Sequence, residues 1–309
     1  TAATGIYKIN GVIYLFNKNA ALAKNRWIVV DGKKYYAKEN GQAAIGYKNI
    51  NNKGYYFESN GAMHVGFINI NAKKYYFGKN GVKVSGKKKI GKYMCYFKKT
   101  GALYRKIDTR KKLVALTYDD GPSKNTNTIL KVLKKYDSTA TFFEVGNRIA
   151  SYKSIVKKID KMGCEIGNHT YEHKILSGCS KAEIRKQIDQ TNSELRKVIG
   201  KKTIITRPPG GNHNKTIDSI IKTPIVLWSV DTLDWKNRNS AYVTNAVLKN
   251  VKDGDIVLMH DLYESTADAS KKIIPALVKR GYQLVTVSEL SDCRKAMRNG
   301  ETYSSFPLK

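Results

Sequence analysis

The first part of the chain is built from a repeated unit of 20 residues. An aromatic pair followed by Asn-Gly recurs at this spacing in copies that begin at Tyr35, Tyr55 and Tyr75, and more loosely at Cys95. A degenerate earlier copy begins at Tyr14. Asn-Gly is a hairpin-turn signal, so each unit is expected to be a short two-stranded hairpin, which cannot bury its own apolar face. The spacing therefore predicts an all-β solenoid of stacked hairpins.

Aromatic, glycine-punctuated repeats of this kind resemble the cell-wall-binding, or choline-binding-like, repeats of secreted Gram-positive proteins. The resemblance implies that rings from neighbouring hairpins form cages for choline on teichoic acid or platforms for sugar rings. The ligand stays open between choline, teichoic acid and glycan, and the alternative is that the rings only fill the core between hairpins. The chain departs from the family pattern at two positions. Only Trp27 keeps the tryptophan of the first, where later copies have Tyr47, Phe67 and Lys87. The aromatic residue expected just before the Tyr-Tyr pair is replaced by Lys34, Gly54 and Lys74.

The chain is strongly basic. Lys and Arg number 56 against 25 Asp and Glu, a formal charge of +31, and residues 1–112 alone hold 24 basic and 4 acidic side chains. Such a surface attracts polyanions, which suits an anionic wall polymer. No nucleic-acid-binding motif accompanies the charge, so nucleic acid is not expected as a partner.

The sequence also constrains location and redox chemistry. No apolar run approaches the roughly 18 residues that span a bilayer, so no transmembrane segment is expected. The chain begins with Thr1 rather than Met, and we expect an export signal to have been removed from a secreted, wall-associated protein of a Gram-positive bacterium. Four cysteines are too few for a disulfide-built scaffold. Cys164 and Cys179 could be bridged, with free thiols as the alternative.

Beyond residue 112 the repeat gives way to apolar strands that alternate with amphipathic helices. The alternation predicts an α/β domain of parallel strands covered by helices, either as a barrel or as an open doubly wound sheet. We expect two domains, residues 1–105 and residues 106–309. The predicted strands are 113–118, 140–145, 164–167, 204–207, 225–230, 255–259 and 282–287, and examples of the predicted helices are 128–136, 181–199 and 267–280.

A candidate metal site comes from two histidines and a pair of carboxylates. His169 and His173 are four residues apart, and on a helical turn this spacing lets two imidazoles bind one metal ion. Alone, such a pair is more often an ordinary polar surface pair. The strand 113–118 runs into Asp119 and Asp120, and adjacent carboxylates on an extended backbone point in different directions. One can therefore bind a cation while its neighbour does proton chemistry.

Five motifs follow the strand ends in order. They are residues 117–122 (Thr-Tyr-Asp-Asp-Gly-Pro), 169–173 (His-Thr-Tyr-Glu-His), 207–211 (Arg-Pro-Pro-Gly-Gly), 231–235 (Asp-Thr-Leu-Asp-Trp) and 258–260 (Leu-Met-His). With these motifs the chain resembles the polysaccharide deacetylases, also called NodB-homology proteins or family 4 carbohydrate esterases. The resemblance covers the C-terminal two thirds and implies a distorted (β/α)7 barrel of the NodB type.

The resemblance implies a ligand set and a metal. It assigns Asp120, His169 and His173 to a divalent cation, which in the family is most often Zn²⁺. Ligand type leaves Co²⁺, Ni²⁺ and Fe²⁺ open. A metal of this kind lowers the pKa of a bound water to about 7, which provides a nucleophile for amide hydrolysis at neutral pH.

The resemblance also assigns the proton chemistry. Asp119 matches the general base and Arg207 the cation that holds it, because an opposite charge nearby keeps a carboxylate ionised. His260 matches the general acid, and its partner Asp234 would make the imidazole more basic. The alternative for Arg207 is an ordinary surface ion pair.

Three further residues are expected to contact the substrate. A backbone N–H near Gly210 would stabilise the oxyanion formed on the acetyl carbonyl. Trp235 and Leu258 would form the walls of an apolar slot for one methyl group, and the alternative is that both are core side chains. Gly210 stands where many family members have Tyr, which reduces the wall of the sugar groove.

These observations predict an exported, metal-dependent deacetylase that acts on the N-acetylglucosamine of peptidoglycan and is held at the wall by its repeats. The motifs determine the reaction, whereas the loops determine which sugar is bound, so a chitooligosaccharide N-deacetylase and an acetyl-xylan esterase are alternatives. A wall-binding protein with a silent barrel is the non-enzyme alternative. The complete set of motifs argues against it, because a degenerate site usually loses a ligand first.

Overall fold

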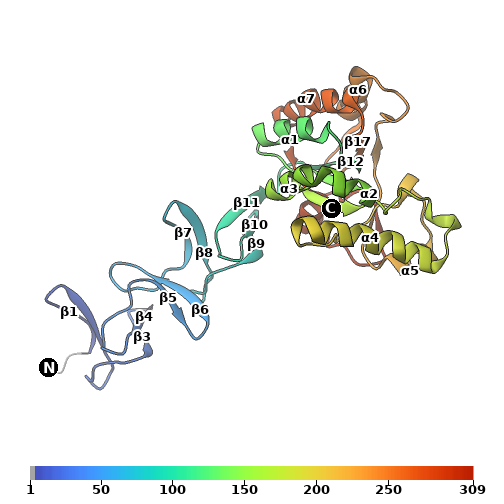
Figure 1. Ribbon diagram of the computed structural model, residues 1–309. Coiled ribbons are helices and arrows are strands. Elements are labelled where there is room, and N and C mark those ends of the chain that lie inside the picture. The colour runs from blue at the N-terminus through green and yellow to red at the C-terminus, as the bar shows by residue number, and fades with distance from the viewer. Residues whose placement is uncertain (1–3, 309) are drawn as a thin grey trace. The chain divides into compact units, whose positions relative to one another are not determined.

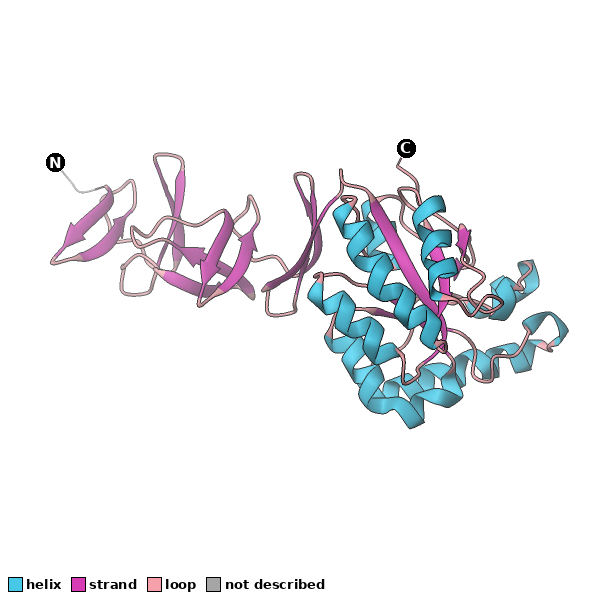
Figure 2. Ribbon diagram, turned by 90° about the horizontal axis from the view of Figure 1, so that it is seen from above, coloured by secondary structure: helices cyan, strands magenta, loops and turns pink. Residues whose placement is uncertain are grey.

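The computed structural model describes residues 4–308 and divides into two compact units (Figure 1). The first unit ends at Ile107 and the second begins at Asp108. Strands make up the first unit, and the second combines strands with helices (Figure 2). Within the described residues, no helix is long and apolar enough to cross a membrane.

The first unit is a series of antiparallel hairpins, as the repeat predicts. Each hairpin joins five-residue strands through a two-residue turn, and the last gains β11 as a third strand. The pairs are β1 (Gly5–Ile9) with β2 (Val12–Phe16), β3 (Arg26–Val30) with β4 (Lys33–Ala37), β5 (Gly46–Ile50) with β6 (Lys53–Phe57), β7 (Gly66–Ile70) with β8 (Lys73–Phe77), and β9 (Gly86–Ile90) with β10 (Tyr93–Phe97), next to β11 (Leu103–Asp108).

The Asn-Gly pairs lie in a different turn from the one that the sequence indicated. Asn60 and Gly61 follow β6 and turn the chain back to a single bridge between Phe57 and Met63. The tight turn inside that hairpin is formed by Asn51 and Asn52, whose φ angles of 49° and 61° are left-handed. Two successive residues with positive φ match the right-handed twist of paired strands. Asn tolerates this conformation, so the two asparagines form the turn without Gly.

Backbone hydrogen bonds join each repeat to the hairpin before it. The Met63 N–H donates to the Lys34 carbonyl at 2.8 Å, and one repeat later the Lys83 N–H donates to the Gly54 carbonyl at the same distance. The core between hairpins is aromatic: Phe57 and Phe77 are fully buried, and the Trp27 ring lies 4.9 Å from that of Tyr55. These rings therefore fill the core.

The second unit is built on a parallel sheet with the strand order β14-β13-β12-β17-β16, in which β18 also pairs with β12. Residues 113–118 of β12 are fully buried, because this central strand is covered on both faces. The strands are β12 (Leu113–Gly121), β13 (Thr141–Glu144), β14 (Glu165–Asn168), β15 (Ile225–Val226), β16 (Val230–Asp231), β17 (Ile256–His260), β18 (Gln283–Leu284) and β19 (Thr302–Tyr303).

Helices connect these strands, and helices 181–199 and 267–280 were predicted closely. The helix α4 begins after Ser180, whose side chain accepts a hydrogen bond from the Glu183 N–H, and it ends at the left-handed Gly200. The helices are α1 (Thr126–Lys135), α2 (Gly146–Ile149), α3 (Lys153–Lys161), α4 (Lys181–Ile199), α5 (Lys215–Ile221), α6 (Ser240–Asn250), α7 (Glu264–Lys279) and α8 (Val287–Cys293), with short 3-10 turns at Ala150–Tyr152, Leu176–Gly178 and Pro209–Gly211.

The structure confirms a mixed α/β unit built on a parallel sheet, but it does not confirm the predicted barrel. Segment 204–207 contributes a single bridging residue, Thr206, between β14 and β15. Segment 225–230 is divided between β15 and β16, because the Leu227 N–H donates to Tyr303 whereas the Ser229 N–H donates to Ile256. Within the described residues, no recorded pairing joins β15 to β16. Cys164 and Cys179 are both thiols, so the bridge between them does not form.

The packing around β14 provides a stability test. A Cβ atom added at Gly167 would overlap the buried ring of Phe143, so we expect Gly167→Ala to lower the free energy of unfolding by about 1–3 kcal/mol. Gly178→Ala is the matched control, because nothing lies within 4 Å of its added Cβ. Chemical denaturation of the full chain measures both. Equal unfolding midpoints for the two variants would contradict this packing.

Candidate active site

The candidate residues gather where neighbouring parallel strands end. Asp119 and His260 are register partners on β12 and β17, so the predicted base and acid lie on adjacent strands. The pairing of β12 with β13 shifts register between Asp119 and Gly121, and the skipped residue, Asp120, has a φ of 68°. This bulge, rather than the regular pleat, lets the two adjacent carboxylates take different roles.

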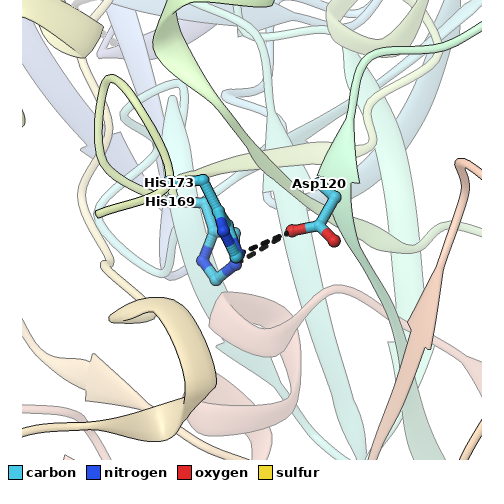
Figure 3. Close-up of side chains that lie close together, drawn as sticks. All are labelled: Asp120, His169 and His173. Carbon is cyan, nitrogen blue, oxygen red and sulfur yellow. Dashed lines mark ion pairs between the residues drawn. The ribbon is translucent and has the colours of Figure 1, made fainter. Parts of the chain in front are cut away.

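Asp120, His169 and His173 come together as the sequence predicted (Figure 3). Each offers one ligand atom, and the three atoms lie within 4.8 Å of one another. The Asp120 Oδ1 atom is 3.3 Å from Nε2 of His169 and 3.1 Å from Nε2 of His173. Burial raises the pKa of Asp120, but when the two imidazoles are protonated, their hydrogen bonds and charge outweigh burial and hold that pKa well below its usual range.

The donor chemistry of the cluster fits a divalent cation. The Arg207 carbonyl lies 2.6 Å from Nδ1 of His169 and can only accept, so Nδ1 carries the proton and Nε2 presents a lone pair to Asp120. The Asp120 Oδ1 atom is buried and accepts no hydrogen bond from the described residues. A buried acceptor beside imidazole lone pairs is the arrangement that a Zn²⁺-like ion satisfies.

The two histidines do not lie on a helical turn, so that part of the sequence interpretation was wrong. Residues 169–175 have no helical assignment. Thr170 and His173 have φ angles of 62° and 57°, which a right-handed helix excludes. The loop places the two imidazole rings 5.1 Å apart.

Asp119 is held by a buried arginine. Asp119 is 3% exposed and Arg207 is fully buried, and Nη1 of Arg207 donates to Oδ1 of Asp119 at 2.7 Å. The same guanidinium donates to the Thr117 hydroxyl at 2.7 Å and to the carbonyls of Val226 and Leu227 at 3.0 and 2.8 Å. The alternative of a surface ion pair is therefore wrong for Arg207. The other oxygen, Oδ2 of Asp119, lies 3.7 Å from Nε2 of His169.

His260 is held by a buried carboxylate. Its Nδ1 donates to Oδ1 of Asp234 at 2.7 Å, while Oδ2 accepts from the His260 N–H and from the Thr266 hydroxyl, each at 2.7 Å. Burial lowers the pKa of His260, but the hydrogen bond and charge of Asp234 outweigh it and raise the pKa to about 9. The imidazole is therefore a cation at neutral pH.

The three predicted substrate residues lie in different environments. Trp235 is 48% exposed, so it is not a core side chain, whereas Leu258 is 4% exposed within β17. Gly210 lies in the turn Pro209–Gly211 with a φ of 63°, and a Cβ added there would approach Ile175 at 3.5 Å.

Sequence reasoning missed a buried acid pair beneath the bulge. A Cβ added at Gly121 would lie 2.6 Å from Asp261 and 2.7 Å from Glu144, so both carboxylates surround this glycine. Burial raises the pKa of each acid, and their mutual repulsion contributes to the rise for Glu144. A charged residue at the end of the apolar run 140–145 was the signal that could have identified Glu144.

A second missed feature borders His260. The Arg238 guanidinium lies 3.4 Å from the ring centroid of Tyr263, and its Nε donates to the Trp235 carbonyl at 2.9 Å. The Tyr263 ring lies 5.9 Å from that of His260. Arg238 therefore ties the Trp235 turn to the aromatic neighbour of the predicted acid.

Comparisons with known families agree with both parts of the chain. Residues 106–223 match the polysaccharide deacetylase family. Residues 25–43, 45–63 and 65–83 each match a cell wall binding repeat.

Individual relatives match about three fifths of the chain. The chain is 42% identical to the peptidoglycan-N-acetylmuramic acid deacetylase PdaC of Bacillus subtilis over 190 residues, which cover 61% of this chain and 41% of that protein. It is 39% identical to a peptidoglycan-N-acetylglucosamine deacetylase of Bacillus cereus over 203 residues, which cover 62% of this chain and 93% of that one. The chain thus spans about two fifths of the length of PdaC.

A solved structure shows the same fold with a metal. The family 4 acetyl xylan esterase from Clostridium thermocellum, in complex with a cobalt ion, superposes with a TM-score of 0.60 at 34% identity. The match covers 64% of this chain and all of that one.

Metal binding by the cluster predicts a gain in stability. A cation that binds only the folded state at about 100 times its Kd raises the free energy of unfolding by about 2.7 kcal/mol. We expect Zn²⁺ or Co²⁺ to raise the melting temperature of the full chain, and His173→Gln to lose most of this rise. His213→Gln is the control, because His213 pairs with Asp218 outside the cluster. A rise that both variants lose, or both keep, would contradict the assignment.

The Asp234–His260 pair predicts a specific titration. The pKa of His260 measured by NMR should lie near 9, and Asp234→Asn should lower it substantially, because burial is then opposed only by the charges of Asp119 and Asp120. Because the folded pKa is raised, this pair stabilises the fold fully below about pH 6.5 and loses its contribution as the pH rises through about 9. Asp268→Asn, an exposed control, should leave the titration unchanged. An unshifted His260 in the native chain would refute the pairing.

Proposed function

Because this chain belongs to the polysaccharide deacetylase family, we propose that its second unit is a metal-dependent hydrolase that removes N-acetyl groups from cell-wall polysaccharide. N-acetylglucosamine of peptidoglycan is the substrate we propose. One observation carries the proposal: Asp119, held by Arg207, and His260, held by Asp234, are register partners on adjacent strands beside a possible metal site. We assign residues 106–309 to this catalytic domain and propose that its strands continue into the seven-stranded NodB-type barrel.

The ligand cluster would hold the metal. When bound by Asp120, His169 and His173, a divalent cation supplies Lewis acidity toward the acetyl carbonyl and an acidified water. We propose Zn²⁺, with Co²⁺, Ni²⁺ and Fe²⁺ as alternatives of the same ligand preference.

Asp119 is suited to accept the proton of the attacking water. Its Oδ1 is occupied by Arg207, which leaves Oδ2 on the side of His169. The buried guanidinium fixes the carboxylate, so the base is preorganised and its free oxygen faces the ligand cluster. Arg207 thus acts by holding and orienting the base.

His260 is suited to protonate the leaving amine. Its Nδ1 proton is committed to Asp234, and with a pKa of about 9 the ring also carries a proton on Nε2 at neutral pH. That second proton is the one available to the sugar nitrogen. Trp235 and Leu258 are proposed to border the acetyl methyl group, and the N–H near Gly210 to stabilise the oxyanion.

We propose that residues 1–105 stack as a wall-binding solenoid and hold the enzyme at the wall of a Gram-positive bacterium after secretion. Three stretches match a cell wall binding repeat, and the sequence up to residue 112 carries 24 basic against 4 acidic side chains, which supports anionic wall polymer such as teichoic acid as a partner. Tethering would raise the effective concentration of glycan at the site. A chitooligosaccharide N-deacetylase or an acetyl-xylan esterase is the alternative activity, since the matched esterase shares the fold.

Acetate release tests the proposed function. We expect the full chain with metal to release acetate from peptidoglycan more efficiently than from chitin oligomers or acetylated xylan, and a chelator to abolish the release. Asp119→Asn should lower kcat by roughly 10²–10⁴-fold with its metal content unchanged, because only the base is removed. Asp189→Asn, on the exposed face of α4, is the matched control.

Two outcomes would refute the proposal. Absence of acetate from all three polysaccharides with metal supplied would favour a wall-binding protein with a silent site. Full activity of a metal-loaded Asp119→Asn variant would remove Asp119 from the mechanism.

A further inference from the structure

A cavity of about 440 Å³ lies among three successive hairpins of the first unit. Its lining includes Lys33 and Lys34 from the second hairpin, Glu58 and His64 from the segment that follows the third, and Lys79, which follows the fourth. The backbone bond from the Met63 N–H to the Lys34 carbonyl joins two of these hairpins beside the cavity. The opening is therefore part of the repeat stack and does not depend on one mobile loop.

The charges around this cavity are unbalanced. Within the described chain, no ion pair or hydrogen bond is recorded for the ammonium groups of Lys33, Lys34 and Lys79. The one carboxylate in the lining, Glu58, is engaged, because Nδ1 of His64 donates to its Oε1 at 2.6 Å. Three exposed lysines thus line one cavity whose only lining acid already has a partner, and an anion bound there would offset their positive charge.

This arrangement belongs to one copy of the repeat. At the positions of Glu58 and His64, the next copy has Gly78 and Val84. Lys83 of that copy, which occupies the position of Met63, donates from its ammonium to the Tyr47 hydroxyl at 2.9 Å and lies 4.5 Å from the ring centroid. The next copy therefore lacks the Glu58–His64 pair that lines this cavity.

We propose that this cavity is a binding site for a phosphodiester group of an anionic polymer. Lysine ammonium groups bind phosphate as point charges, and their rotatable donors can meet oxygens that point in several directions. The lining of the cavity contains lysine and no arginine. The inference rests on the proposed wall-binding role of the repeats and gives that role a specific site, with teichoic-type polymer as the ligand class.

Binding of a glycerol phosphate oligomer to the full chain, measured by calorimetry, tests the proposal. The double variant Lys34→Gln/Lys79→Gln should lower affinity by about tenfold, and added salt should weaken binding of the native chain. Lys88→Gln/Lys89→Gln is the matched control, because it removes the same charge from exposed positions of β9 outside the cavity lining. That variant should lower affinity by less than about threefold. An oligoglutamate of equal charge should bind more weakly than the phosphate probe.

Each contrary outcome has a distinct meaning. Equal losses in both double variants would show diffuse attraction and overturn the site, as would no loss in either. Equal binding of oligoglutamate would overturn the phosphate assignment. If the chain sediments equally with sacculi before and after removal of teichoic acid, this inference fails while wall binding stands. If the chain sediments with neither preparation, the proposed wall binding itself fails.

Discussion

The buried ion pair between Arg207 and Asp119 is the interaction on which the second unit depends. A guanidinium with no exposure to solvent is tolerated only if its donors are paired, and Arg207 donates to a carboxylate, a hydroxyl and two carbonyls. Its own carbonyl accepts the Nδ1 proton of His169. One residue thus orients both the proposed base and a proposed metal ligand, and it joins β12 to the end of β15 and to Leu227, which follows that strand.

On the β17 side of the site, the His260–Asp234 pair reverses the charge arrangement of the Arg207–Asp119 pair. On β12 a carboxylate is held by a buried cation, and on β17 an imidazole is held by a buried carboxylate. The two environments separate the acid from the base at neutral pH, since His260 keeps its proton while Asp119 faces a permanent positive charge. Because Asp119 and His260 are register partners, the parallel sheet fixes their proximity without help from a loop.

The sequence predicted most where local pattern and tertiary fold agree. The 20-residue repeat predicted the hairpins, and the amphipathic pattern of residues 181–199 predicted α4 to the residue. Sequence pattern did not predict the features that tertiary contacts determine. His173 lies in a loop and has a left-handed φ angle, and Glu144 is buried beside Asp261. The cluster of Asp120, His169 and His173 was predictable because strand ends converge. The bulge at Asp120 was not, since no local signal distinguishes it from regular strand.

The central claim is that one divalent cation is held by Asp120, His169 and His173, next to a base and an acid that the sheet has already positioned. The most direct measurement is anomalous diffraction at the metal edge from crystals grown with Zn²⁺ or Co²⁺. A single strong peak in contact with all three side chains is the predicted result. A map with no peak there, after loading with either metal, would contradict the account and leave the paired carboxylate and imidazole without a reaction to serve.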